Sequence, residues 1–136
     1  MRITCIIATV IFLVITSLQF NDFSQYGNAD WWSWVVIYVL TAVISAVSVK
    51  RPLPRWMVTA MAGFALGGFI FRMQDDLGNF HFERFAGAWL YDESGTQMVQ
   101  QTNEAGGLFL VFVWLVVLAI WRVAEGNHKS DGVNLA

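Results

Sequence analysis

The chain has 136 residues, of which 57% are hydrophobic and only 13% are charged, and its formal net charge is −2. Soluble domains carry about 25% charged residues, so this composition indicates a membrane protein of one domain. The single cysteine, Cys5, excludes an internal disulfide and a multi-cysteine zinc site, and no basic cluster is suited to track a nucleic-acid backbone.

Four apolar stretches approach the length of roughly 20 residues that a transmembrane helix needs. In chain order they predict helices at residues 3–20, 31–49, 55–73 and 105–122, with an outer loop at 74–104. The expected fold is an all-α integral membrane four-helix bundle, with residues 1–136 forming one transmembrane domain. A cleaved signal peptide is the alternative for the first stretch, but the run is long and no A-x-A-like cleavage site follows it.

The connections between the helices differ in length. Lys50-Arg51-Pro52-Leu53-Pro54 contains two prolines that cannot continue a helix, so it predicts a tight hairpin between antiparallel neighbours. The outer loop is too long to be a mere connector. Its aromatic first half predicts a segment that lies on the membrane surface or folds back over the bundle.

The distribution of positive charge predicts the orientation in the membrane. If all four helices cross, only Arg72 and Arg84 fall on one side, which the positive-inside rule makes the outer side. Both termini are then cytoplasmic, although nothing indicates which membrane hosts the protein. Tryptophans near the predicted helix ends are expected to anchor the protein at the interface, and a ligand cage is the alternative: Trp31, Trp32, Trp34, Trp56 and Trp121.

Small residues predict where helices pack closely. Gly63 and Gly67 have GxxxG spacing in the third helix, and such residues let two backbones approach in lipid. We expect both glycines to face another helix, which is more readily one of the same chain than of a partner. The second helix offers Thr41, Ser45 and Ser48 as a complementary small face.

A candidate polar cluster gathers at the predicted outer boundary of the membrane. Its members are Gln19, Asn21 and Asp22 at the end of the first helix, Arg72 at the end of the third, and Glu104 at the start of the fourth. Glu104 is expected to pair with Arg72. Ionisable residues near membrane spans mark functional sites, but the same residues can simply cap helix ends, and both interpretations stay open here.

Other site chemistry finds little support. His81 and Glu83 are too few to form a metal site, and no nucleophile elbow, phosphate loop or zinc-hydrolase motif is present. The sequence therefore predicts no catalytic residue, no metal and no cofactor, and it disfavours an enzyme without excluding one.

Two segments resemble a known family. Leu18-Gln19-Phe20-Asn21-Asp22, a following tryptophan and Val35-Val36-Ile37-Tyr38 are similar to the N-terminal half of the transmembrane protein 220 family, which has a Q-x-N-D-P-D segment after its first helix. Glu104-Ala105-Gly106-Gly107-Leu108 resembles the family's R-E-x-x-G-L opening of a membrane helix. The chain departs from these motifs at Phe23-Ser24, at extra residues before Trp31, and at Asn103 in place of arginine.

The resemblance implies a small multi-pass membrane protein and supplies no biochemical activity. It marks six signature positions, most of which also belong to the polar cluster: Gln19, Asn21, Asp22, Tyr38, Glu104 and Gly107. The favoured function is an accessory or interaction subunit that contacts the lipid bilayer and other membrane proteins or itself. The alternative is a small-ligand or lipid-binding protein, or an enzyme, that uses the polar cluster.

Overall fold

The computed structural model describes residues 1–20, 31–51, 53–74, 77–82 and 104–121. Four long helices lie in them: α1 (Arg2–Gln19), α3 (Trp31–Lys50), α4 (Arg55–Arg72) and a helix spanning Glu104–Trp121, here called the Glu104 helix. Each bound is within one residue of the predicted one. The described part contains no strand beyond an isolated β-bridge between Gln74 and Phe80. The all-α prediction is therefore confirmed.

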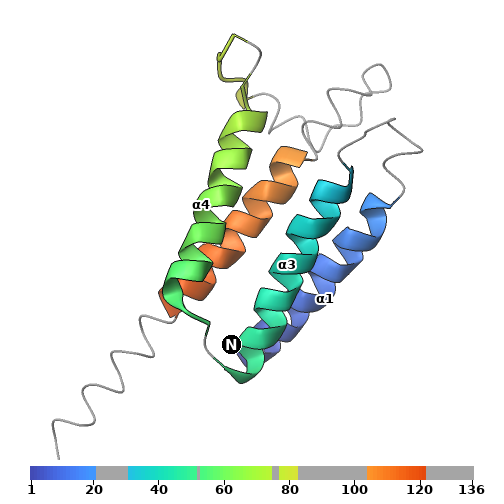
Figure 1. Ribbon diagram of the computed structural model, residues 1–136, viewed down its shortest axis with the longest axis vertical. Coiled ribbons are helices and arrows are strands. Elements are labelled where there is room, and N and C mark those ends of the chain that lie inside the picture. The colour runs from blue at the N-terminus through green and yellow to red at the C-terminus, as the bar shows by residue number, and fades with distance from the viewer. Residues whose placement is uncertain (21–30, 52, 75–76, 83–103, 122–136) are drawn as a thin grey trace, which may run out of the picture.

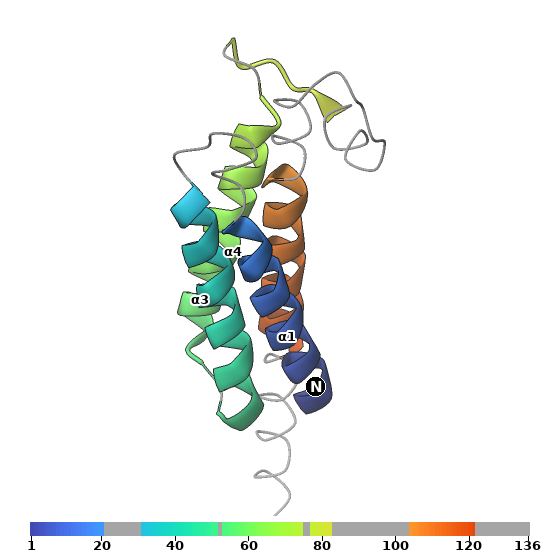
Figure 2. The same ribbon diagram turned by 90° about the vertical axis from the view of Figure 1, so that its right-hand side faces the viewer.

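The four helices lie side by side and form a bundle (Figure 1). α1 packs along α3, while α4 and the orange Glu104 helix form the other pair (Figure 2). Proline explains the sharp reversal after α3, because Pro54 stands at the N-cap of α4 and has no N–H to continue a helix. α1, α3 and the Glu104 helix are each long and apolar enough to cross a membrane.

The core lies between the helices and follows the helical period. Cys5, Ala8, Phe12 and Thr16 point inward from α1, at spacings of three and four residues. The Glu104 helix adds a longer apolar stripe with the same spacing: Ala105, Leu108, Val111, Leu115 and Leu118. α4 contributes Val58, Ala62 and Ala65, which are small enough to let its backbone approach its neighbours.

The buried face of α3 is more polar than its exposed face. Trp34, Tyr38, Thr41, Ser45 and Ser48 all point inward at alternating spacings of four and three. The exposed side of the same helix carries large apolar residues instead: Trp32, Val36, Leu40 and Val43. A soluble helix has the opposite arrangement, so the surface of this bundle matches a lipid solvent.

Hydrogen bonds satisfy much of this inward polar face. The hydroxyls of Thr41 and Ser45 donate to the carbonyl oxygens of Ile37 and Thr41, each over 2.8 Å. The indole Nε1–H of Trp114 on the Glu104 helix donates to Ser45 Oγ, also over 2.8 Å. That bond joins two helices inside the bundle, where interhelical hydrogen bonds contribute about 0.6 kcal/mol on average.

Candidate functional site

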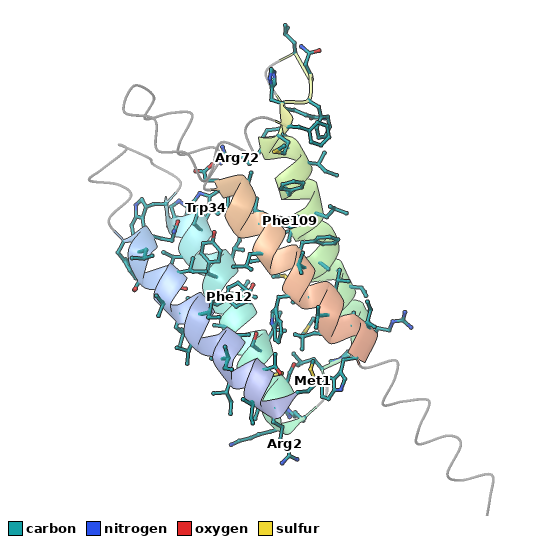
Figure 3. All side chains as sticks on the ribbon, turned by 180° about the vertical axis from the view of Figure 1, so that it is seen from behind. Met1, Arg2, Phe12, Trp34, Arg72 and Phe109 are labelled. Carbon is teal, nitrogen blue, oxygen red and sulfur yellow. The ribbon has the colours of Figure 1, made fainter. Side chains whose placement is uncertain are left out.

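An ion pair joins α4 to the Glu104 helix at one end of the bundle. Arg72 is the last residue of α4 and Glu104 is the first of the next described helix, and these helix ends lie together (Figure 3). Arg72 Nε lies 3.1 Å from Glu104 Oε2. The contact is electrostatic in kind, because the two atoms are close without being aligned as donor and acceptor.

Both charges are also favourable to the helices that carry them. A carboxylate at a helix N-terminus and a guanidinium at a helix C-terminus each complement the helix dipole. The Glu104 side chain is 8% exposed and the Arg72 side chain 28%, so the carboxylate depends on its cation far more than a surface residue would. The pair therefore holds two helix ends together and neutralises a buried charge.

Trp34 covers the other side of the arginine. The Arg72 guanidinium carbon lies 5.5 Å from the centroid of the Trp34 ring, within the range of a cation–π interaction, and Trp34 itself is buried. One helical turn along α3, Tyr38 contacts Trp34 at 6.4 Å between ring centroids and stacks on Phe12 of α1 at the same separation. The rings of Trp34, Tyr38 and Phe12, here called the aromatic column, thus pack in series next to the Arg72–Glu104 end of the bundle.

Gly107 makes room for Tyr38, the middle ring of this aromatic column. The hydroxyl of Tyr38 occupies the space that a Cβ at Gly107 would fill, and Tyr38 Cζ lies 3.0 Å from that position. The adjacent Gly106 has no such neighbour within 4 Å. Only glycine fits at 107, which ties the Glu104 helix to α3 just below the ion pair.

A family model named "Transmembrane family 220, helix" matches residues 11–120, which include the second half of α1, all of α3 and α4, and nearly all of the Glu104 helix. The chain belongs to transmembrane family 220. No curated protein and no solved structure matches it. The predicted resemblance is thereby confirmed, and family membership together with the three span-competent helices makes this a membrane protein.

Three family-220 signature positions meet in this structure. Tyr38, Glu104 and Gly107 all lie at the charged end of the bundle, on two helices that are separated by more than 50 residues of sequence. Arg72, which the sequence pointed to as the partner of Glu104, is that partner. Three of the six resemblance positions therefore lie at the end of the bundle that holds the ion pair.

Of the remaining members of the predicted polar cluster, only Gln19 lies within the described residues. Gln19 is half-buried at the end of α1, and the described contacts of the ion pair do not include it. Asn21 and Asp22 lie outside the described residues. His81 is described, and its backbone N–H donates to the Met73 carbonyl oxygen over 2.9 Å, while Glu83 lies outside the described part.

The predicted packing of Gly63 and Gly67 against a helix of the same chain is not found among the described residues, and packing against a partner's helix stays a prediction. Gly63 and Gly67 are exposed, and a Cβ at either would meet nothing within 4 Å, so they do not face another described helix. Ala62 and Ala65, on the opposite side of α4, are the small residues that point inward. The close approach that involves a glycine of α4 is instead at Gly68, where a Cβ would lie 3.1 Å from Leu108 Cδ1.

Sequence reasoning also missed part of the site. Trp34 was interpreted as an interface anchor, whereas the structure buries it against Arg72. The spacing of residues 34, 38, 41, 45 and 48 could have indicated that Trp34 is buried, because these positions follow one face of a helix. Among the described residues, no group of three or more His, Cys, Asp or Glu side chains could hold a metal ion.

Proposed function

We propose that this member of transmembrane family 220 is a non-enzymatic accessory protein that presents α4 to a transmembrane helix of another polypeptide. The observation that carries the proposal is the exposed position of Gly63 and Gly67, which leave an open strip along α4. In lipid, helix association relies on close backbone approach, which small residues permit. A strip of this kind that is not used inside the bundle is available for a partner.

The neighbours of the two glycines support this interpretation. On a helical wheel of α4, Thr59 and Ala60 fall on the same exposed arc, and Phe64 and Phe71 stand at its edge as bulky, exposed ridges. The result is a short strip at Gly63 and Gly67 with the two phenylalanines along one edge, and the exposed Trp56 and Ile70 lie on the same arc at its two ends. Because a straight partner helix can lie along such a strip, the geometry fits a protein helix as the contact.

α4 differs in composition from the other three described helices. α1, α3 and the Glu104 helix meet the length and hydropathy expected of a membrane span, whereas α4 has an arginine at each end and three glycines within it. In the proposal α4 crosses the membrane with the others, its terminal arginines reach the interface, and a partner helix shields its less apolar face from lipid.

The test is a bulky substitution on the strip with a matched control. Gly67→Leu should leave the thermal midpoint of the isolated chain nearly unchanged, since a Cβ there meets nothing within 4 Å. It should also reduce the recovery of a crosslinked partner from native membranes at least tenfold. Ala46→Leu, an equally exposed small-to-large change on α3, should retain that partner.

Two results would overturn the accessory role. One is recovery of monomer alone after crosslinking in native membranes. The other is a captured protein that is lost equally from Gly67→Leu and from Ala46→Leu, because such binding does not depend on the strip.

The orientation completes the proposal and has its own test. Both termini are expected on the cytoplasmic side, which places the Arg72–Glu104 end outside. Cysteines introduced as Ser94→Cys and Ser130→Cys should react with an impermeant maleimide from opposite sides, the first from outside and the second only after permeabilisation. Labelling of the Ser94→Cys variant from the cytoplasmic side alone would reverse the topology.

A ligand-binding role at the ion pair is the second candidate. The Trp34 indole N–H favours it, because this donor is buried and has no acceptor among the described residues. An oxygen atom of a small ligand would satisfy it beside Arg72. The candidate has less support than the accessory role because the two charges already neutralise each other.

A further inference from the structure

Four cationic side chains lie at the end of the bundle opposite the ion pair. Arg2 is the first residue of α1, Lys50 the last of α3, Arg51 follows it, and Arg55 is the first of α4. All four side chains are exposed. They are here called the basic end, and the proposed accessory role gives them no ligand.

The fold brings these residues together from three segments. α1 starts at the end of the bundle where α3 turns into α4, as two perpendicular views show (Figures 1 and 2), and Arg2 lies at the opposite end of the molecule from Arg72 (Figure 3). Met1, Val49 and Leu53 pack against the same core beneath the charges. The basic end is therefore a feature of the tertiary structure, although Lys50 and Arg51 are also adjacent in sequence.

No described carboxylate neutralises these charges. Glu104 is the only acidic residue among the described ones, and it lies at the far end in its pair with Arg72. The N-termini of α1 and α4 and the C-termini of α3 and the Glu104 helix all lie at this end, so the helix dipoles offset one another and the positive charge comes from the four side chains. The described part of this end therefore attracts anions.

The depth of the charges indicates which anion reaches them. Each cation directly borders an apolar helix, so the charges lie at the level of lipid headgroups when the helices span the bilayer. Trp56, the neighbour of Arg55, is 72% exposed, and tryptophan favours this same interfacial level. A phosphate anchored in the leaflet is thus more accessible to these side chains than one that approaches from bulk water.

We infer that the basic end, formed by Arg2, Lys50, Arg51 and Arg55, binds the phosphate groups of anionic phospholipids in the adjacent leaflet. Exposed cations next to a membrane helix attract acidic lipids within a Debye length of the surface. Trp56 places its ring beside the bound headgroups.

The experiment measures lipid binding to the full chain in zwitterionic detergent micelles by native mass spectrometry. The probes are phosphatidylglycerol and phosphatidylcholine with the same acyl chains, and inorganic phosphate serves as competitor. Phosphatidylglycerol should bind at least about 20-fold more tightly at low salt, and the preference should shrink severalfold in about 0.5 M salt. Equal affinity for the two lipids, or displacement of lipid by millimolar inorganic phosphate, would overturn the inference.

Variants test whether the four cations are responsible. Replacing all four by glutamine should abolish the preference, with a loss of about fivefold for each cation removed. A matched control, Arg2→Lys combined with Arg51→Lys and Arg55→Lys, should keep it, because charge and not side-chain shape is required. If the fourfold variant fails to insert, Arg51→Gln and Arg55→Gln alone should each weaken binding about fivefold, and unchanged affinity in both would refute the assignment.

Discussion

Gly107→Ala is expected to lower the free energy of unfolding by about 2 kcal/mol, the usual cost of forcing extra atoms into a packed core. The added methyl group would meet the Tyr38 hydroxyl and ring, which already fill that space. The tyrosine has little freedom to retreat, because it stacks on Phe12 and contacts Trp34. Thermal unfolding in detergent, followed by near-UV circular dichroism of the aromatic residues, measures the loss.

The neighbouring glycine supplies a matched control. Gly106→Ala makes the same chemical change one residue earlier, where nothing lies within 4 Å of the new methyl group. Alanine favours a helix over glycine by about 1 kcal/mol, so this variant should be as stable as the wild type or more stable. In a Tyr38→Phe background the cost of Gly107→Ala should shrink without vanishing, because Tyr38 Cζ is still close. Equal effects of both alanine variants would contradict the proposed contact.

The helices were predictable because the bilayer imposes a simple rule on sequence. A span needs an uninterrupted apolar run, and α1, α3 and the Glu104 helix each have one between polar segments. The prolines before α4 and the arginines at its ends fixed its limits equally well. The ion pair followed from the same reasoning, because Arg72 and Glu104 terminate antiparallel helices at the same depth.

The faces of the helices were harder to predict, and α4 shows why. Small residues occur on both of its sides, with Ala62 and Ala65 inward and Gly63 and Gly67 outward. In a soluble protein the apolar side would be the buried one, but in lipid both sides are apolar and hydrophobicity gives no direction. The spacing of the glycines predicted a contact with another helix, and among the described residues that helix is not one of this chain.

The partners of Tyr38 could not be predicted for a different reason. Its contact with Gly107 joins positions 69 residues apart, and its depth in the bundle depends on how two helices are staggered. The length and hydropathy of a helix do not determine its position along a neighbouring helix to better than several residues. The described side chain that fixes that position is Trp114, through its hydrogen bond to Ser45 of α3, while the approach of Leu108 to Gly68 positions the same helix against α4.

Breaking the ion pair is expected to destabilise the bundle strongly. Arg72→Met should lower the free energy of unfolding by about 3 kcal/mol, because it leaves the buried Glu104 carboxylate without its cation and removes the contact with Trp34. Arg72→Lys should cost about 1 kcal/mol, since an ammonium retains the charge but not the planar stacking. Chemical unfolding in mixed micelles provides the measurement.

A double-mutant cycle separates the pair from its surroundings. Glu104→Gln keeps the shape of the side chain and removes its charge, so the combination with Arg72→Met should be more stable than the sum of the two single losses predicts, by about 1 to 3 kcal/mol. Additive losses would mean that the 3.1 Å contact contributes little to the fold.

The same variants distinguish a structural pair from a ligand site. If the pair only joins α4 to the Glu104 helix, the loss of any cellular phenotype should follow the loss of folded protein across Arg72→Lys, Arg72→Met and Glu104→Gln. A ligand at Trp34 and Arg72 would break that correlation, because Arg72→Lys would then remove function while most of the protein remained folded. A linear relation between folded fraction and phenotype across the series would leave the ion pair as the connection that holds α4 in place, with its outward strip of glycines available to a partner.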